Sequence, residues 1–205
     1  MAYSEFTLAK VQQAFDLTLE EGDWFAAVPE TTPSAFLIQT LEENQFLATA
    51  IGTEKARSEF LIAPILVEVR RQLHYQAALF SGTEFNVEPS QGLQGFCDFL
   101  LSASKEQFFI QAPVVTIVEA KKEDLIGGLG QCVATMVGAQ LFNQRSGNPI
   151  ETIYGAVTSG TNWRFLRLKQ QVVQIDSTEY FLVQVPKILG ILLEPFHPAP
   201  VPPTA

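Results

Sequence analysis

The chain has 205 residues, of which 47% are hydrophobic, and it carries a formal net charge of −9 at pH 7. This length and composition predict one globular domain with a sizeable core. The 22 acidic residues outnumber the 13 basic ones, which argues against a protein that coats nucleic acid by charge alone. A groove that gathers a few cations remains compatible with this charge.

The cysteines and the chain ends give no sign of secretion or membrane insertion. Cys97 and Cys132 are too few and too far apart for a disulfide framework or a zinc site. No stretch reaches the roughly 18 consecutive apolar residues of a membrane span, and the N-terminus lacks a signal pattern. We therefore expect a cytoplasmic protein with no membrane partner. The 16 phenylalanines leave room for an oligomer interface, and we expect a homodimer.

Residues 1–52 show helical patterns without a chemical motif. Apolar residues recur at helical spacing between residues 5 and 21, which predicts a helix that ends near Gly22. Ser34 then opens a second helical pattern that runs to Gly52. We expect residues 1–52 to be a helical extension packed on the core.

A long helix is predicted from about Thr53 to Phe80. On this helix Glu59 falls on the apolar stripe that contains Ile62 and Leu66. By the same count Glu68 points to the opposite side, where a solvated charge needs no explanation. Glu59 is therefore the acid of this helix that we expect to have a function.

The centre of the sequence is a β-branched run at residues 113–118, typical of a strand buried on both faces. The run ends in Glu119, Ala120 and Lys121. Because side chains alternate along a strand, Glu119 and Lys121 project from the same face as the strand leaves the core. A carboxylate and an ammonium group are thus expected side by side.

A second candidate strand, residues 95–101, carries one acid, Asp98, among apolar neighbours. Burying an isolated aspartate is costly unless it is paired or bound to a cation. The polar segment 102–107 can turn the chain, so that the two strands pair as a hairpin with Asp98 near Glu119. Two carboxylates and a lysine suit a divalent metal that activates water, with the lysine stabilising developing charge.

The order Asp98, then Glu119-Ala120-Lys121, resembles the metal-binding signature of the PD-(D/E)xK nuclease superfamily. Residues 56–66 resemble that superfamily's first core helix, and residues 154–163 resemble a strand and turn of type I restriction-subunit N-terminal nuclease domains. The resemblance covers roughly residues 53–170. It implies an α/β fold with a restriction-endonuclease-like core, in which helices flank a mixed central β-sheet.

The same resemblance implies a metal-dependent nuclease that hydrolyses phosphodiester bonds of nucleic acid, with DNA as the expected partner. Mg²⁺ or Mn²⁺ would be the cofactor. Asp98, Glu119 and the carbonyl group of Ala120 would hold the metal, and Lys121 would orient or activate the attacking water. A salt bridge at a strand end is the simpler explanation of Glu119 and Lys121 taken alone.

The roles of two further site residues follow from the resemblance. Glu59 would be an outer or second-metal acid. Gln131 resembles the helix glutamine of some exonuclease-type members, although Thr135 stands where their tyrosine would be, and a plain helix-start residue is the alternative. Two other functions remain open for the whole chain: an inactive domain of this fold that binds or regulates a partner, and a purely structural oligomer whose acids bind nothing.

The rest of the chain completes the expected core, residues 53–194. The glycines at 127, 128 and 130 match neither GxGxxG nor the Walker pattern, so they do not indicate a phosphate loop. The predicted elements are a strand at 82–88, a helix at 129–145, strands at 150–158 and 163–168, a hairpin turning at 176–178, and a short helix at 187–193. Residues 195–205 contain too many prolines for regular structure and are expected to be a mobile tail.

Overall fold

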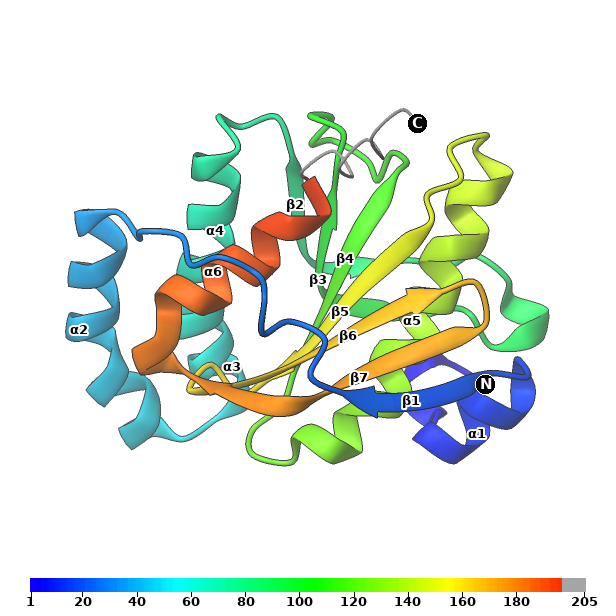
Figure 1. The fold of residues 1–205 in the computed structure, drawn as a ribbon, viewed down its shortest axis with the longest axis horizontal. Helices are drawn as coiled ribbons and strands as arrows, with labels where there is room; N and C mark the ends of the chain where they lie inside the picture. The colour runs from blue at the N-terminus through cyan, green and yellow to red at the C-terminus, as the bar shows by residue number, and fades with distance from the viewer. Residues whose placement is uncertain (197–205) are drawn as a thin grey trace.

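A single open sheet of seven strands forms the centre of the protein in a computed structural model (Figure 1). The structure describes residues 1–196, so most of the expected tail lies outside the described residues. The strand order is β1-β7-β6-β5-β4-β3-β2. The strands are β1 (Thr18–Gly22), β2 (Ala78–Glu84), β3 (Phe96–Ser102), β4 (Val114–Ala120), β5 (Thr152–Thr158), β6 (Asn162–Lys169) and β7 (Val172–Phe181).

The sheet is mixed. β4 pairs with β5, and β1 with β7, in parallel, whereas all other neighbours are antiparallel. The parallel step from β4 to β5 needs a crossover, and a long helix supplies it, as is usual for parallel neighbours. This arrangement confirms the predicted class, an α/β protein with a mixed central sheet flanked by helices.

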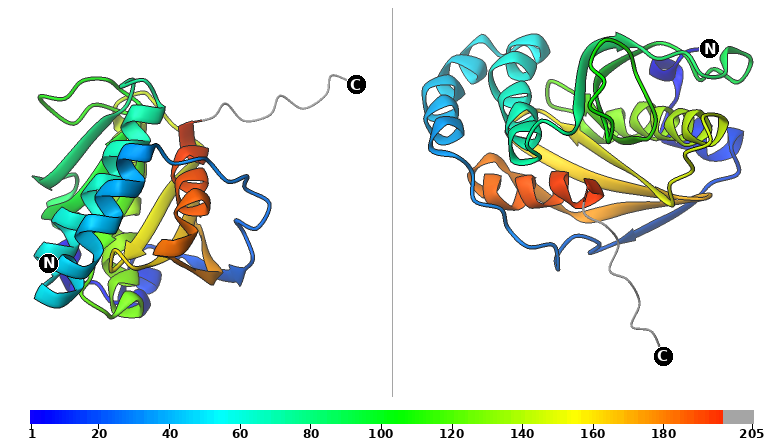
Figure 2. Two further views of the ribbon diagram at one scale, coloured as in Figure 1. Left: turned by 90° about the vertical axis from the view of Figure 1, so that its left-hand side faces the viewer. Right: turned by 90° about the horizontal axis from the view of Figure 1, so that it is seen from above.

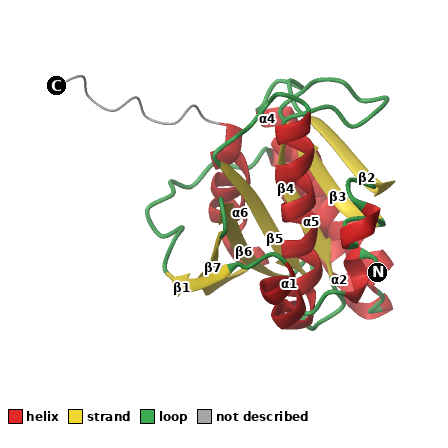
Figure 3. Ribbon diagram, turned by 90° about the vertical axis from the view of Figure 1, so that its right-hand side faces the viewer, coloured by secondary structure: helices red, strands yellow, loops and turns green. Residues whose placement is uncertain are grey.

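Helices cover both faces of the sheet. The crossover helix α5 and the short α1 lie on one face (Figure 3), and α4 and α6 lie on the other, with α2 packed outside α4 (Figure 2). The helices are α1 (Leu8–Ala14), α2 (Ala35–Ile51), α3 (Glu54–Arg57), α4 (Ala63–Gln72), α5 (Leu125–Arg145) and α6 (Val185–Leu193). Single 3₁₀ turns occur at Tyr3–Glu5, Pro89–Gln91, Leu182–Gln184 and Glu194–Phe196.

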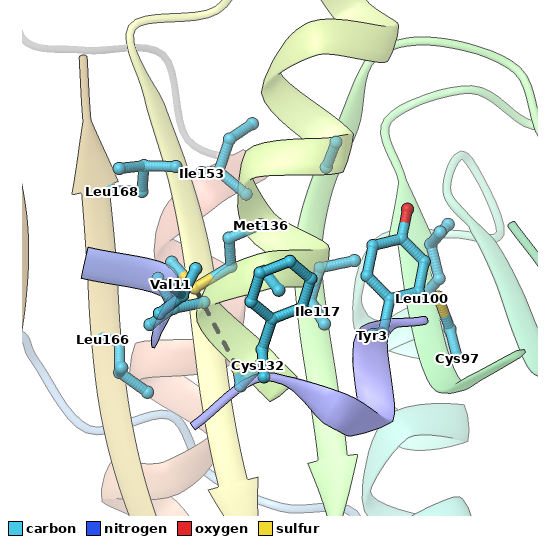
Figure 4. Packing of buried hydrophobic residues seen from close by; sticks show 14 of the residues in the cluster. Tyr3, Val11, Cys97, Leu100, Ile117, Cys132, Met136, Ile153, Leu166 and Leu168 are labelled. Carbon is cyan, nitrogen blue, oxygen red and sulfur yellow. Dashed lines mark hydrogen bonds between the residues drawn. The ribbon is translucent and has the colours of Figure 1, made fainter. Parts of the chain in front are cut away.

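Strand β4 separates two hydrophobic clusters. Ile117 packs with Tyr3, Val11 and Met136 on the α5 face (Figure 4), whereas its neighbour Val118 faces the cluster under α4 and α6. All seven residues of β4 are buried. The prediction of a strand buried on both faces is confirmed, and its β-branched side chains fill both layers.

Helix α5 is the central helix of the α5 face. Within the described residues it is the one helix long and apolar enough to cross a membrane, but 67% of its apolar window is buried in the protein. Its glycines allow close packing, since a Cβ at Gly130 would lie 2.3 Å from the carbonyl carbon of Thr7. The predicted helix at 129–145 is confirmed, although it begins earlier, with Asp124 as its N-cap.

The prediction of one helix over residues 5–21 is wrong. Helix α1 ends at Ala14, Asp16 takes a positive φ of 52°, and the chain continues as β1. Strand β1 pairs in parallel with β7 at the edge of the sheet. The apolar spacing was misleading because Leu19 packs against the core from a strand, where tertiary pairing overrides local pattern. Residues 1–52 thus supply a strand as well as helices.

The helix predicted to reach Phe80 is also too long. Helix α4 ends at Gln72, and β2 begins at Ala78, so the strand predicted at 82–88 lies earlier in the chain. His74 and Tyr75, with φ of 51° and 59°, make the turn between them. Left-handed backbone at two successive residues cannot continue a right-handed helix.

The hairpin predicted at residues 176–178 is wrong as well. Strand β7 continues through Asp176 without a turn, and the chain reverses earlier, at Gln170 and Gln171. Asp176 is fully buried and accepts hydrogen bonds from the hydroxyl of Tyr180 (2.9 Å) and the backbone N–H of Trp24 (3.3 Å). These partners satisfy the buried carboxylate without water. The polar residues resembled a solvated turn in the sequence for lack of visible partners.

Other elements follow the predictions. Helix α2 begins after Ser34, whose side chain accepts a hydrogen bond from the N–H of Leu37, and ends at Gly52 with φ of 66°. The short helix predicted at 187–193 is confirmed as α6. The β3–β4 hairpin is present and antiparallel, which places the two predicted acidic strands next to each other.

Candidate metal and catalytic site

Strands β3 and β4 separate at the end where the predicted acids lie. The last backbone pair towards that end joins Phe99 to Val118. Beyond it, the Oδ2 atom of Asp98 accepts a hydrogen bond from the backbone N–H of Ala120 at 2.8 Å. The carboxylate therefore takes the place of a strand partner, and it is held beside Glu119.

Glu119 is almost completely buried, with 2% of its surface exposed. Burial, followed by the charge of Asp98, raises the pKa of Glu119 to about 8, although Lys121 acts in the opposite direction. Such a carboxylate is costly to keep charged in this position. Strongly shifted pKa values of this kind are common at functional sites.

Lys121 bridges the acid and the crossover helix. Its Nζ atom lies 2.7 Å from Oε1 of Glu119 and 3.3 Å from Oε1 of Gln131 on α5. Burial tends to lower the pKa of Lys121, but the charge and hydrogen bond of Glu119 outweigh burial and raise it. The ammonium group is therefore charged at neutral pH and held between two fixed partners.

The glycine run at the start of α5 has a packing role that sequence reasoning missed. A Cβ atom at Gly128 would lie 2.6 Å from Val157 and 3.0 Å from the Cγ of Lys121. The first distance is shorter than real Cβ contacts and the second is very tight, so a side chain here would force its neighbours to move. Gly128 therefore leaves the space in which the stem of Lys121 lies between α5 and the sheet.

Glu59 is not on the buried stripe, so that prediction is wrong. Residues Ser58–Ile62 form a turn of π-helix, in which the extra residue per turn rotates the following side chains relative to those before it. The side chain of Glu59 is 53% exposed and pairs with Lys55 at 2.7 Å. It nevertheless lines the same pocket as Asp98, of about 290 Å³, and so lies at the edge of the site.

The structure reverses the expectation for Glu68, which is 2% exposed rather than solvated. Its carboxylate accepts hydrogen bonds from the backbone N–H (3.0 Å) and the hydroxyl (2.9 Å) of Ser34, and from the side chain of Gln72 (3.0 Å). Glu68 thereby satisfies the donors at the start of α2, where a negative charge is favoured. Its role is structural.

Two residues of α3 also reach the site region, and no motif had indicated them. Glu54 lies close enough to Lys121 for its charge to raise the pKa of that lysine. Arg57 donates from Nη1 to the carbonyl of Ser159 (3.1 Å) and to the hydroxyl of Thr161 (3.2 Å). The β5–β6 turn thus holds α3 beside the ends of the central strands. Only the tertiary arrangement reveals these contacts.

The acids do not form a large cluster. Within residues 1–196, no group of three or more His, Cys, Asp and Glu side chains is close enough to hold a metal ion. The arrangement offers two adjacent carboxylates, from Asp98 and Glu119. Ala120 follows Glu119 in β4 and is buried, but the contact observed with Asp98 is made by its N–H. Metal binding by its carbonyl group stays a prediction.

The comparisons with known proteins add no functional information. The chain matches no protein-family model, and a search of curated proteins found no match. The signature Asp98…Glu119-Ala120-Lys121 and the geometry that brings these residues together are therefore the grounds for assigning a function.

Proposed function

We propose that this chain is a Mg²⁺- or Mn²⁺-dependent nuclease with a restriction-endonuclease-like fold, which hydrolyses phosphodiester bonds of nucleic acid, DNA in the first place. The observation that carries the proposal is the convergence of Asp98, Glu119 and Lys121 at one end of the β3–β4 hairpin. Three charged groups placed at the border of a hydrophobic sheet need a common explanation, and a bound cation supplies it.

The residues fit such an ion. Mg²⁺ prefers oxygen ligands and usually binds through one or two carboxylates together with waters and substrate phosphate. Asp98 and Glu119 supply two carboxylates, so the lack of a larger cluster within the described residues is no obstacle. A divalent cation would also offset the cost of keeping Glu119 charged in a buried position.

The side chains divide the chemistry between them. The bound ion would lower the pKa of a water molecule and offset charge on the phosphate. Lys121, held by Glu119 and Gln131, would keep a positive charge beside the reacting phosphate, where charge grows in the transition state. Glu59, at the edge of the pocket, would act on the outer side of the site.

The location and assembly are part of the proposal. We place the nuclease in the cytoplasm, and a homodimer would allow paired sites to cut two strands. Light scattering at micromolar concentration measures the mass directly. A monomeric mass would rule out the dimer without affecting the chemistry.

Single-turnover cleavage of DNA and RNA with Mn²⁺ tests the function. Lys121→Ala should reduce the rate by about 10²-fold or more, the scale for losing one preorganised electrostatic group, while metal binding persists because an ammonium is not a ligand. Lys122→Ala is the matched control, since Lys122 is exposed and follows directly in the sequence. Equal rates for Lys121→Ala and the wild type would contradict the proposal.

The second candidate is an inactive domain of the same fold that binds or regulates a partner. The ion pair between Lys121 and Glu119 favours it, because these charges already satisfy each other without a ligand. In that case the wild type would cleave no substrate in the same assay. Metal binding would then separate a regulatory metal site from a purely structural oligomer.

A further inference from the structure

The pocket beside Asp98 is small. It encloses about 290 Å³ and is lined on one side by Lys55 and Ser58 of the α3 region and on the other by Ser81 of β2. Pockets for small ligands have volumes of roughly 300 to 1,000 Å³, so this one lies just below that range and takes at most a group about the size of one nucleotide. A double helix, whose major groove alone is about 12 Å wide, would not enter it.

The charges around the pocket do not favour a duplex. Three of the four cations at this end are engaged, since Lys55 pairs with Glu59, Lys121 pairs with Glu119, and Arg57 donates to the β5–β6 turn. The fourth, Lys122, is exposed and is a single charge. Duplex DNA carries one negative charge per about 1.7 Å of axis, and proteins that bind it by charge neutralise on the order of 6 to 10 phosphates. A single strand presents half that charge density.

The cations farther along the sheet are also engaged. Arg145 pairs with Glu88 at 2.5 Å and Arg164 with Glu179 at 3.5 Å, whereas Arg167 lies over the rings of Trp24 and Phe25. None of these three arginines is free to contact the phosphates of a second nucleic-acid strand. These arginines thus form no extended basic track leading from the pocket.

An exposed aromatic residue lies next to the acids. Phe96 is 66% exposed and begins β3, two residues before Asp98, which places it about 7 Å away along the strand. An exposed ring is a stacking platform for an unpaired base, and such stacking is insensitive to sequence. In a duplex the bases are stacked on each other and could not use it.

We propose that the site takes a single strand or an unpaired flap of nucleic acid, with one base stacked on Phe96 and the adjoining phosphate bound through the metal ion that Asp98 and Glu119 would hold. This inference rests on the proposed nuclease function and specifies its substrate. The phosphate contacts are few, so binding should depend only weakly on salt. About two neutralised phosphates would give a slope of roughly −1.4 for log K against log salt.

Two measurements test the proposal. The first is cleavage with Mn²⁺ of labelled 20-nucleotide single strands, blunt duplexes and flapped duplexes, in DNA and in RNA. We expect single strands and flaps to be cut at least tenfold faster than the blunt duplex. Phe96→Ala should slow cleavage of single strands about tenfold, as expected for the loss of one stacked base. Phe108→Ala is the control, because Phe108 is 96% exposed in the loop at the opposite end of β3.

The second measurement is binding, which does not need turnover. Fluorescence anisotropy with the Lys121→Ala variant and Mg²⁺ should show at least tenfold tighter binding of the single strand than of the duplex. Equal or tighter duplex binding, or no effect of Phe96→Ala, overturns the single-strand inference and leaves the nuclease proposal in place. Tighter single-strand binding without cleavage by the wild type overturns the nuclease proposal and retains the single-strand site.

Discussion

The Nζ atom of Lys121 lies 2.7 Å from Oε1 of Glu119 at the end of a strand whose every residue is buried. Glu119 is 2% exposed and the side chain of Lys121 is 25% exposed, so the pair lies at the boundary between core and solvent. The Coulomb attraction in this position is stronger than in a surface ion pair, because water screens it less, but the burial of Glu119 opposes it. A ligand that binds here must either break the contact between Lys121 and Glu119 or bind to the intact pair.

Metal binding should stabilise the fold. Mg²⁺ or Mn²⁺ at about 100 times its dissociation constant would add about 2.7 kcal/mol, because the ion binds only the folded state. For a chain of this size that corresponds to a rise in Tm of roughly 5 to 10 °C. Thermal unfolding followed by circular dichroism measures the shift. The double variant Asp98→Asn with Glu119→Gln should lose it.

Glu42→Gln is the control for the metal experiment, since Glu42 is exposed on α2 and its loss removes one negative charge. Its Tm should rise with metal as in the wild type. If the double variant responds to metal as strongly as Glu42→Gln, the ion binds somewhere else.

Metal affinity should increase with pH. The pKa of Glu119 is raised to about 8, so below that pH a proton occupies the carboxylate and competes with the ion. The dissociation constant should fall about tenfold per pH unit from pH 6 and level off above about 8. Calorimetry across this range measures it, and a pH-independent affinity would show that Glu119 is not a ligand.

Without metal, the raised pKa of Glu119 makes the folded state less stable as the pH increases. The folded state holds its proton on Glu119 more tightly than the unfolded chain does, so this contribution is complete below the unfolded pKa of about 4.3. It is lost as the pH rises towards about 8, the folded pKa of Glu119. Glu119→Gln should flatten that part of the stability curve measured by urea denaturation in the presence of a chelator.

We expect that Lys121 can take its position only because Gly128 has no side chain. Gly128→Ala would place a methyl group 2.6 Å from Val157 and 3.0 Å from the Cγ of Lys121. We expect a loss of about 1 to 3 kcal/mol of stability from overpacking, and a reduced turnover measured well below the Tm. Ile126→Ala, at an exposed position two residues earlier on the same helix, should change neither the stability nor the turnover.

Alanine substitutions of two glutamates in the same helical region should have very different effects on the free energy of unfolding. Glu68→Ala leaves the donors of Ser34 and Gln72 without an acceptor, and should cost about 3 kcal/mol, as for losing a buried charged hydrogen-bond partner. Glu59→Ala removes an exposed pair with Lys55 and should cost less than about 1 kcal/mol. Urea unfolding measures both, and equal losses would contradict the assignment of Glu68 as the structural acid.

The sequence by itself determined the centre of the fold. The β-branched run before Glu119 predicted a strand buried on both faces, because only such a strand tolerates uninterrupted apolar side chains. The polar turn between the acidic strands predicted the hairpin that places Asp98 beside Glu119. Strand alternation placed Glu119 and Lys121 together, and the structure has them in contact.

Only the tertiary structure decided the rest. Strand β1 exists because β7 offers it a partner, which apolar spacing in a short segment cannot reveal. The π-turn at Ser58–Ile62 moved Glu59 to the surface, because one extra residue in a turn changes which side chains face the core. Glu68 and Gly128 owe their roles to neighbours far away in the chain, Ser34 for Glu68 and Val157 for Gly128, and such contacts leave no periodic trace in the sequence.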